Sequence, residues 1–359
     1  MRVCVLGLRG FPLIEGGVER HCEALYPRME EEITVIRRKP YVTDKCMAKS
    51  NYEHISFVDL PSTTLKGFEA VFHSFLATRK AIKLKPDVVH IHNIGPALFS
   101  GMLSKRGIPV VLTYHSPNYE HSKWGGFAKK LLLHSEKVAL KNSRRVIFVN
   151  RFQMEKYPDE IRQKSVYIPN GIIEPVFSKS TSYLEEIGVE KNKYVLAVGR
   201  ITPEKGFDTL IKGFKASKHD GYKLVIAGGV EFESGYMEEL KLLSDDDVIF
   251  TGYVYGDKLA QLYTNAALYV LSSNNEGFPL VLLEAMSYGL DILASNIPSC
   301  HLVRLEEDDY FPRGDDKALS GKINERLKTP KKRIYELKEY NWNVVAEETA
   351  KVLREATNQ

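Results

Sequence analysis

Short apolar runs recur along the chain, and segments long enough for a helix separate most of them. In the first half, the runs that predict strands are residues 3–7, 33–36, 88–92, 110–114 and 146–150. In the second half, they are residues 194–198, 223–227, 248–251, 268–271 and 291–294. Helices are expected to begin near residues 18, 206, 236, 258, 279 and 297. Strands that alternate with helices predict an α/β protein whose parallel sheets carry helices on both faces.

This alternation of strands and helices starts twice, so we predict two domains. A length of 359 residues suits two cores better than one. The turn-forming residues Ile168-Pro169-Asn170-Gly171 mark the expected boundary between residues 1–170 and residues 171–340. Both domains are expected to be doubly wound and Rossmann-like, with ligands bound at the carboxyl ends of the strands. We expect the two domains to face each other across a ligand-binding cleft.

Residues 341–359 are the third part of the expected organisation. Apolar side chains recur there at helical spacing, which predicts a helix with one apolar face. That face would consist of Trp342, Val345, Ala346, Val352, Leu353 and Ala356. We expect this helix to pack back toward the N-terminal domain.

Composition narrows the class of protein. With 43% hydrophobic and 27% charged residues, the chain is typical of a soluble globular protein. No apolar run approaches the roughly 20 residues that a membrane-spanning helix needs. The N-terminal run lacks the small-residue cleavage site of a signal peptide. The four cysteines show no CxxC spacing, which favours reduced thiols and a cytoplasmic location.

The net charge of +4 hides an asymmetry between the two halves. Residues 1–170 contain 27 Lys and Arg against 16 Asp and Glu, whereas residues 171–359 contain 23 against 30. The first half is therefore expected to face something anionic. Its stretch from Lys123 to Arg145 mixes aromatic and leucine side chains with lysines. Such a helix either lies on an anionic membrane surface or packs on its own domain with a solvated basic face.

Two cations follow the expected strand at residues 194–198. Arg200 lies at its carboxyl end, and Lys205 precedes Gly206, where a helix is expected to begin. Arginine binds phosphate through two parallel hydrogen bonds, lysine acts as a mobile point charge, and a helix N-terminus attracts anions. The two side chains therefore suit a diphosphate. The alternative is a solvated loop with two surface charges.

Two carboxylates flank the next expected helix start. Glu276 lies in the loop after the strand at residues 268–271, and Pro279 suits the first helical position. Glu284 lies one turn further on, among apolar neighbours where an unpaired acid is costly. Because helical side chains lean toward the N-terminus, Glu284 can reach the same edge and bind the hydroxyls of a ribose. Alternatively, Glu276 caps the helix and Glu284 faces solvent.

Two glycines of the first half, Gly16 and Gly17, follow the first strand and precede a helix. Paired glycines let a backbone approach a ligand closely, and a plain flexible loop is the other interpretation. The segment does not complete G-x-G-x-x-G, which argues against a dinucleotide-dependent oxidoreductase.

Three histidines lie at strand ends. His90 and His92 share one face of a strand, so they could chelate a metal. No cysteine or carboxylate cluster completes such a site, and structural histidines are the preferred interpretation. His115 ends the next strand, where it either contacts a substrate or belongs to the core or a cap.

These segments together resemble glycosyltransferase family 4, which adopts the GT-B fold of two facing Rossmann-like domains. The resemblance runs over essentially the whole chain. It rests on GGVER, HIHNIGPAL, TYHSPNYE, PNG, VGRITPEKG and EGFPLVLLEAMSYG, which occur in this order. The E-x7-E spacing of that family matches Glu276 and Glu284.

The resemblance implies a donor site in the cleft. Arg200 and Lys205 would bind the diphosphate of the donor, and Gly16 and Gly17 would let their loop approach it. The backbone that would support the sugar and the phosphate belongs to Phe278, Pro279, Leu280 and Val281.

The resemblance also implies which side chains act on the sugar. Glu276 would contact the transferred sugar, Glu284 the ribose of the nucleoside, and His115 the sugar near the reacting carbon. The family retains the configuration of the sugar and needs no metal. Arg200 and Lys205 agree with this, because they can stabilise a leaving diphosphate without a cation, and no DxD pair lies at a strand end.

No carboxylate pair can be assigned to a nucleophile, so we expect same-face substitution, in which the departing phosphate oxygen takes the proton of the acceptor. No cofactor is expected besides the nucleotide-sugar co-substrate, for which a UDP-sugar is favoured over a GDP-sugar.

We therefore predict a retaining, metal-independent hexosyltransferase of bacterial type. It would move a hexose or N-acetylhexosamine to a glycan or lipid-linked glycan in lipopolysaccharide, capsule or exopolysaccharide synthesis. A cytoplasmic protein, peripheral on the inner face of the plasma membrane, would explain the basic half, and no nucleic-acid partner is expected. The alternatives are a nucleotide-sugar epimerase of GT-B fold and a non-catalytic protein that binds membrane surfaces.

Overall fold

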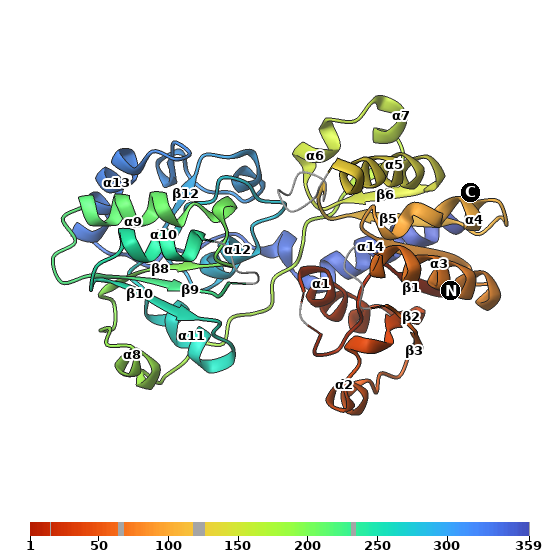
Figure 1. Cartoon of the computed structure of the whole chain (residues 1–359), viewed down its shortest axis with the longest axis horizontal. Coiled ribbons are helices and arrows are strands. Elements are labelled where there is room, and N and C mark those ends of the chain that lie inside the picture. The colour runs from red at the N-terminus through yellow and green to blue at the C-terminus, as the bar shows by residue number, and fades with distance from the viewer. Residues whose placement is uncertain (15, 64–67, 118–125, 231–234, 359) are drawn as a thin grey trace. The chain divides into compact units, whose positions relative to one another are not determined.

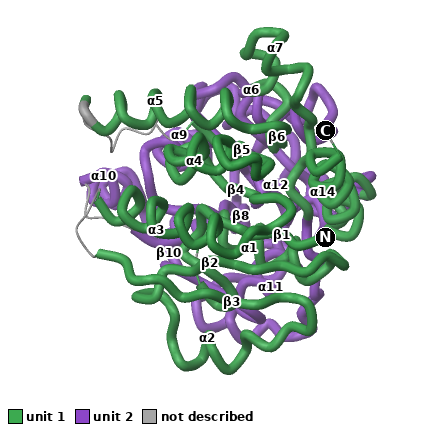
Figure 2. The backbone as a smooth tube through the Cα atoms, turned by 90° about the vertical axis from the view of Figure 1, so that its right-hand side faces the viewer, with its two compact units in different colours: residues 1–171, 338–359 green, residues 172–337 purple. Residues whose placement is uncertain are grey.

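The computed structural model describes residues 1–14, 16–63, 68–117, 126–230 and 235–358 (Figure 1). The chain divides into two compact units. Unit 1 contains residues 1–171 and 338–359, and unit 2 contains residues 172–337 (Figure 2).

Unit 1 is built on a parallel sheet of seven strands in the order β3-β2-β1-β4-β5-β6-β7. The strands are β1 (Arg2–Leu6), β2 (Glu32–Arg38), β3 (Ile55–Leu60), β4 (Val88–His92), β5 (Val110–Tyr114), β6 (Arg145–Phe148) and β7 (Ser165–Tyr167). Successive residues of β1 belong to different cores: Val3 to one face of the sheet and Cys4 to the other. Helices must therefore cover both faces.

Two groups of helices cover these faces. One face packs against α1 (Gly17–Leu25) and α14 (Trp342–Thr357), and the other against α3 (Glu69–Leu84), α4 (Ser100–Ser104) and α5 (Gly126–Asn142). The other α-helices described in this unit are α2 (Asp44–Lys49), α6 (Arg151–Glu155) and α7 (Asp159–Arg162).

Helix α14 is part of the core of unit 1, although it follows all of unit 2 in the sequence. The six apolar side chains expected to form its face are all at least 95% buried, which confirms the face predicted from helical spacing. Two ion pairs flank the packing, from Arg354 to Glu31 at 2.6 Å and from Arg145 to Glu355 at 2.9 Å.

Gly171 is needed for this packing and not for a left-handed turn. A Cβ atom at Gly171 would lie 2.5 Å from Cδ2 of Trp342 on α14. The PNG segment, read from the sequence as a turn, is thus also the place where the backbone lies directly against the indole ring.

Unit 2 is built on a parallel sheet of six strands in the order β10-β9-β8-β11-β12-β13. The strands are β8 (Tyr194–Val198), β9 (Lys223–Ala227), β10 (Val248–Gly252), β11 (Leu268–Leu271), β12 (Ile292–Ser295) and β13 (Tyr310–Phe311). The helices are α8 (Ser182–Glu186), α9 (Phe207–Ala216), α10 (Tyr236–Leu243), α11 (Gly256–Asn265), α12 (Leu280–Ser287) and α13 (Asp316–Lys328). Helices α9, α10 and α13 share one core with the sheet.

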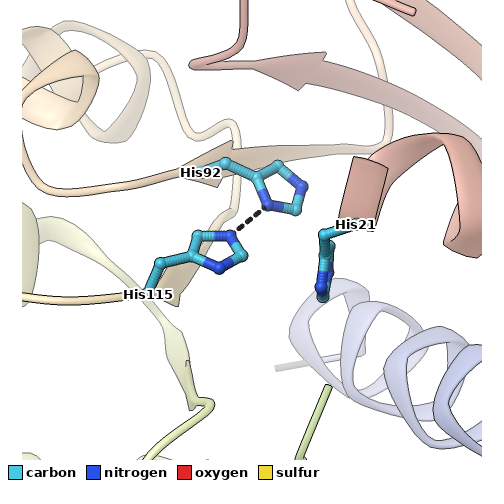
Figure 3. A group of neighbouring side chains, drawn as sticks. All are labelled: His21, His92 and His115. Carbon is cyan, nitrogen blue, oxygen red and sulfur yellow. Dashed lines mark hydrogen bonds between the residues drawn. The ribbon is translucent and has the colours of Figure 1, made fainter. Parts of the chain in front are cut away.

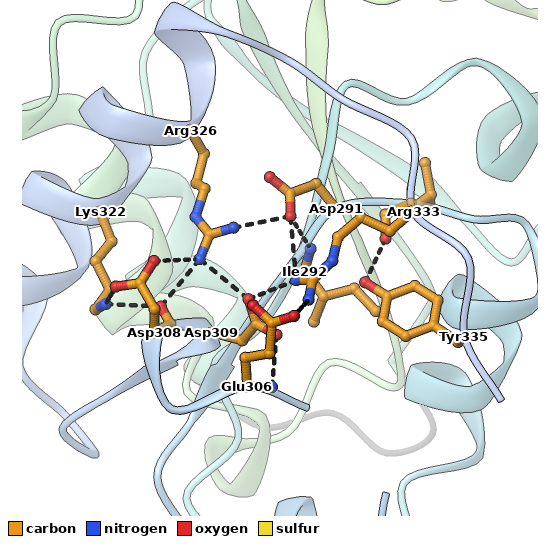
Figure 4. A network of polar contacts seen from close by, with 10 residues as sticks. Asp291, Ile292, Glu306, Asp308, Asp309, Lys322, Arg326, Arg333 and Tyr335 are labelled. Atoms are coloured by element: carbon orange, nitrogen blue, oxygen red, sulfur yellow. Dashed lines mark hydrogen bonds and ion pairs between the residues drawn. The ribbon is translucent and has the colours of Figure 1, made fainter. Parts of the chain in front are cut away.

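A buried network of charges lies beside β12 and β13 in unit 2 (Figure 4). Asp309 accepts from Arg326 at 3.0 Å and from Arg333 at 2.6 Å, and Asp291 accepts from Arg326 at 3.0 Å. Both aspartates are essentially inaccessible to solvent. Burial by itself would lower the pKa of each arginine, but the neighbouring aspartates outweigh it and the pKa values are raised. The network links α13, the start of β12 and residues 331–335.

The structure differs from the expected elements mainly at the sheet edges. The expected strands all form, within a few residues of their predicted ends. The sequence pattern missed β3, β7 and β13. The helix expected near residue 297 is wrong, because Pro298–Leu302 forms only a 3-10 segment.

Candidate functional site

Each sheet reverses its winding direction at one point. In unit 1 the chain leaves β1 for β2 and β3, then returns to add β4 on the other side of β1. In unit 2 the chain likewise leaves β8 for β9 and β10, then returns to add β11 on the other side of β8. The loops after two such neighbouring strands diverge, and in open α/β sheets ligands bind between them. Most of the candidate residues follow these strands.

The loops after β8 and β11 bring Lys205 and Glu276 into contact. Nζ of Lys205 lies 2.6 Å from Oε1 of Glu276, and the two side chains are only 16% and 10% exposed. Oγ of Ser273 donates a second hydrogen bond to the same carboxylate oxygen, also at 2.6 Å. Among the described residues, no donor reaches Oε2 of Glu276. One carboxylate oxygen is thus available to a ligand beside a half-buried cation.

Gly206 allows this approach of the two loops. Its φ of +62° lies in the left-handed region, and a Cβ atom there would lie 2.3 Å from the carbonyl oxygen of Ser272. Oγ of Ser272 in turn donates to the carbonyl oxygen of Lys205 at 2.9 Å. Helix α9 therefore begins at Phe207, just after the glycine, and Lys205 belongs to the 3-10 segment Pro203–Lys205.

Glu284 is supported from α11. The hydroxyl of Tyr263 donates to Oε2 of Glu284 at 2.9 Å, and the Tyr263 ring stacks on Tyr288 with centroids 5.1 Å apart. Burial, reinforced by the nearby Glu284 carboxylate, raises the pKa of Tyr263 well above its usual value, so this hydroxyl remains a donor. Glu284 is partly buried and does not face solvent freely.

The remaining candidates of unit 2 surround this pair of loops. Arg200 follows β8 and has an exposed side chain. Helix α12 begins at Leu280, so Pro279 is its N-cap and not its first residue. Phe278, Leu280 and Val281 are half-buried, and Pro279 is buried.

In unit 1, Gly16 and Gly17 precede α1 in different environments; Glu15 lies outside the described residues. A Cβ atom at Gly16 would lie 1.8 Å from Oε2 of Glu19, whose other oxygen accepts from the backbone N–H of Arg9 at 2.9 Å. Gly16 thus makes room for a buried carboxylate of its own chain. No described residue comes within 4 Å of the Cβ position of Gly17, so toward that part of the chain its backbone is open to approach.

His115 lies in a cluster of histidine rings at the carboxyl ends of β4 and β5 (Figure 3). Nδ1 of His92 and Nε2 of His115 are 3.0 Å apart. His21, on α1, packs edge-on against His115 with ring centroids 4.8 Å apart, and its Nδ1 lies 2.8 Å from Oδ1 of Asn170. His92 is completely buried, whereas His115 is partly exposed. His115 is therefore the member of the cluster that a ligand can reach.

Burial keeps these imidazoles neutral near pH 7. It lowers the pKa of His21 to about 4 and that of His90 to about 3. It also holds the pKa values of His92 and His115 well below their usual range, with the neighbouring histidines adding to the effect.

Sequence reasoning did not include His21 or Tyr26, although both contact the histidines of β4. The hydroxyl of Tyr26 lies 2.9 Å from Nδ1 of His90 and 2.6 Å from Nε2 of His92. The sequence predicts only that a helix begins near residue 18, and no local pattern indicates which strand that helix covers.

Among the described residues, the group that could hold a metal is His21, His92 and His115, whose ligand atoms lie within 4.8 Å of one another. The pair His90 and His92, raised from the sequence, does not form such a group. Both nitrogens of His92 already take part in hydrogen bonds, to Tyr26 and His115. A metal ion would have to displace one of them.

The basic stretch from Lys123 to Arg145 is only partly described, because residues 123–125 lie outside the described residues. The remainder is mostly α5, which packs on its own unit: Oγ of Ser135 donates to the carbonyl oxygen of Ile94 at 2.5 Å. Its exposed lysines are Lys129, Lys130, Lys137 and Lys141. In the part of the chain that the structure describes, no helix has both the length and the hydropathy to span a membrane.

Two family models match the chain. Residues 15–173 match the model described as Glycosyltransferase Family 4, and residues 181–341 match Glycosyl transferases group 1. An uncharacterized glycosyltransferase of Methanocaldococcus jannaschii is 30% identical over 302 residues, which cover 75% of this chain and 75% of that protein. The amylovoran biosynthesis glycosyltransferase AmsD of Erwinia amylovora is 27% identical over 150 residues, 41% of this chain and 42% of its own.

A solved structure shares the fold. Anabaena Alr3699/HepE in complex with UDP matches with a TM-score of 0.79 at 17% identity, over 99% of this chain and 100% of that one. Together with the family matches, it confirms the resemblance inferred from the motifs and the GT-B fold.

Proposed function

Since the chain belongs to glycosyltransferase family 4, with the GT-B fold, we propose that it moves a hexose or N-acetylhexosamine from a nucleotide-diphosphate sugar to a hydroxyl group of a glycan or lipid-linked glycan. The family accounts for glycosyl transfer itself; the donor, the acceptor and the stereochemistry are the content of the proposal. The observation that carries it is the contact of Lys205 with Glu276 where the winding of unit 2 reverses. It puts a cation for a diphosphate beside a carboxylate for sugar hydroxyls.

The ion pair is compatible with a bound diphosphate. An ammonium group has three donors, so Lys205 can keep its hydrogen bond to Glu276 while it donates to a phosphate oxygen. Arg200, exposed after β8, adds a planar guanidinium that suits bidentate phosphate binding. Glu284, oriented by Tyr263, would accept hydrogen bonds from the ribose hydroxyls. The UDP in the Anabaena structure supports a UDP-sugar as the donor.

The proposed reaction retains the configuration of the sugar. The acceptor oxygen bonds to the anomeric carbon on the face from which the bond to the phosphate oxygen breaks. The proton of the acceptor hydroxyl passes to that departing oxygen, and the nucleoside diphosphate leaves. Arg200 and Lys205 stabilise the charge that develops on the phosphate, which is why no metal is invoked. His115 would contact the sugar near its reacting carbon.

The acceptor side of the proposal rests on charge. The excess of basic residues in the first half and the exposed lysines of α5 suit an anionic, lipid-linked acceptor at the inner face of a membrane. The name of the Erwinia relative, which refers to amylovoran biosynthesis, supports a role in bacterial polysaccharide synthesis.

A thermal-shift screen against UDP-, GDP-, ADP- and CMP-sugars tests the donor. A ligand at about a hundred times its dissociation constant adds about 2.7 kcal/mol of stability, which is easily detected. We expect a UDP-sugar to give the largest shift and Glu284→Gln to reduce it. If no nucleotide sugar stabilises the protein, the proposed donor site is wrong.

A transfer assay with the stabilising donor then tests the reaction. Free nucleoside diphosphate should accumulate only when a glycan acceptor is present. An epimerase would change the donor without acceptor and release no nucleotide. Binding to anionic liposomes that survives Glu276→Ala, without turnover of any donor, would instead identify a membrane-surface binding protein.

A further inference from the structure

An unbroken chain of hydrogen bonds leads from the core of unit 1 to His115. Oγ1 of Thr113 lies 2.7 Å from Nε2 of His90, and the chain continues through the hydroxyl of Tyr26 to Nε2 of His92. It ends with Nδ1 of His92 against Nε2 of His115 at 3.0 Å. Every member before His115 is at most 1% exposed. We call Thr113, His90, Tyr26 and His92 the relay.

The relay has a direction. A neutral imidazole has one N–H donor and one acceptor nitrogen, and a tyrosine hydroxyl has one proton to donate. If Tyr26 donates to His92, then His92 must donate to His115 through Nδ1, and Tyr26 must accept from His90. If Tyr26 donates to His90 instead, every bond reverses. The two arrangements put the proton of His115 on different nitrogens.

The distances select one arrangement. O–H donors make shorter hydrogen bonds than N–H donors. If donation runs from Thr113 toward His115, a hydroxyl donates in the two short contacts, 2.6 Å from Tyr26 to His92 and 2.7 Å from Thr113 to His90. The two longer contacts, 2.9 Å from His90 to Tyr26 and 3.0 Å from His92 to His115, are those in which an imidazole N–H would then donate. The reverse direction would give the hydroxyl donor the 2.9 Å contact and imidazole N–H donors the two short ones. The contact between His92 and His115 has an N–H donor in either direction. The three contacts with a hydroxyl therefore favour donation running from Thr113 toward His115.

This direction determines what His115 offers to a ligand. Its Nε2 accepts from His92, so its proton lies on Nδ1. Among the described residues, no hydrogen-bond partner reaches Nδ1. We propose that Tyr26, His90 and His92 are positioning residues that hold His115 in its Nδ1–H tautomer, so that it presents a hydrogen-bond donor to an oxygen of the transferred sugar. The inference rests on the proposed function, in which His115 contacts that sugar.

The competing interpretation is a metal site made of His21, His92 and His115. It leaves the agreement among the three contacts with a hydroxyl unexplained, and it requires His92 or His115 to lose their mutual hydrogen bond. The relay is therefore the interpretation that the geometry favours, and metal binding becomes an outcome of the test.

Tyr26→Phe is the decisive variant, because it removes one hydroxyl and keeps the ring that stacks on Phe11. The matched control is Tyr194→Phe, which removes an equally buried hydroxyl that donates to a backbone oxygen in unit 2. Nitrogen-15 NMR of histidine-labelled full-length protein, with His115 assigned from the spectrum of His115→Asn, reports the tautomer directly.

We expect His115 to be protonated on Nδ1 in the wild type and in Tyr194→Phe, and to lose most of its Nδ1–H population to the Nε2–H tautomer in Tyr26→Phe. We expect kcat to fall at least roughly tenfold in Tyr26→Phe, with the KM for the donor nearly unchanged, because a donor to the transition state is lost. Tyr194→Phe should leave both constants close to wild type.

Three outcomes would overturn the inference. They are a wild-type His115 protonated on Nε2, a tautomer that Tyr26→Phe does not change, and a changed tautomer with wild-type kcat. Zn²⁺ at one equivalent should leave the three imidazole signals in place; a shift of all three, with activity that a chelator abolishes, would establish the metal site instead. If no donor supports transfer by the wild type, the proposed function fails, while the NMR result still decides whether the relay sets the tautomer.

Discussion

Lys205 and Glu276 illustrate how a single contact can be both structural and functional. A half-buried ion pair must offset the loss of hydration of its members, and Ser273 helps by donating to the same carboxylate oxygen. Leaving Glu276 unpaired would therefore perturb the loop before α12 as well as the phosphate site. Tests at this position need a readout of folding beside the readout of turnover.

Lys205→Ala should reduce kcat about a hundredfold, because the leaving diphosphate loses a cation where charge develops. Steady-state release of nucleoside diphosphate measures the effect, and thermal unfolding checks the fold. Lys258→Ala is the control, since Lys258 forms an exposed ion pair with Glu186 in the same unit. Turnover of Lys205→Ala close to that of Lys258→Ala would remove Lys205 from the phosphate site.

Glu284→Gln should raise the KM for the donor roughly tenfold with a smaller change in kcat, because a hydrogen bond to a charged acceptor contributes about 1.5–3 kcal/mol. Tyr263→Phe should have the same direction and a smaller size, since it only loosens the carboxylate. Isothermal titration calorimetry with UDP compares the affinities of the two variants with that of the wild type. An unchanged affinity for UDP in Glu284→Gln would place the ribose elsewhere.

Among the elements, the central strands were predictable and the edges were not. The strands β4, β5, β8, β9 and β11 are mostly apolar, because helices bury them on both faces, and their ends agree with the prediction. The three missed strands, β3, β7 and β13, all lie at the edge of a sheet. Of these, β3 and β7 are only partly buried, and β13 has just two residues, so none gives a long apolar run.

For the candidate site, the sequence predicted the residues but not the contacts between them. Chemistry alone placed Lys205 and Glu276 in two loops, but their contact depends on β8 lying next to β11, and strand order is not a local property. The contact of Tyr26 with His90 and His92 depends likewise on the packing of α1 and its 3-10 extension over β4. No periodicity in the sequence indicates it.

The charge network of Asp291, Asp309, Arg326 and Arg333 is expected to stabilise unit 2. Asp309→Asn should destabilise the protein by about 3 kcal/mol, because two buried arginines lose their shared carboxylate. Asp308→Asn is the control, since that side chain is 62% exposed and its ion pairs are screened. Thermal unfolding followed by circular dichroism compares the two, and equal melting temperatures would contradict the proposed role of the network.

For the whole molecule, the buried histidines predict a loss of stability in acid that is confined to unit 1. The pKa of His21 is about 4 and that of His90 about 3, against about 6.5 in an unfolded chain. Below pH 6.5 the unfolded chain binds more protons than the folded one, so the free energy of unfolding falls as the pH falls. At pH 5 each histidine should contribute a loss of about 2 kcal/mol.

Trp342 lies in the core of unit 1, so in a Trp124→Phe variant the tryptophan fluorescence in urea reports the unfolding of that unit. The fluorescence midpoint should move to lower urea between pH 7 and pH 5, and it should separate from the midpoint of circular dichroism, which reports both units. If the two midpoints coincide at pH 5, the loss of stability in acid is not limited to unit 1.

The place of α14 also bears on how the protein is made. Ribosomes deliver the chain in order, so unit 2 leaves the exit tunnel complete, while unit 1 still lacks the helix that covers Cys22, Leu25 and their neighbours. Until residues 342–357 emerge, the part of this sheet face that α1 does not cover is open to water and to other nascent chains. The half of the protein that is synthesised first thus completes its core last, because residues 172–337 are translated before the helix that finishes it.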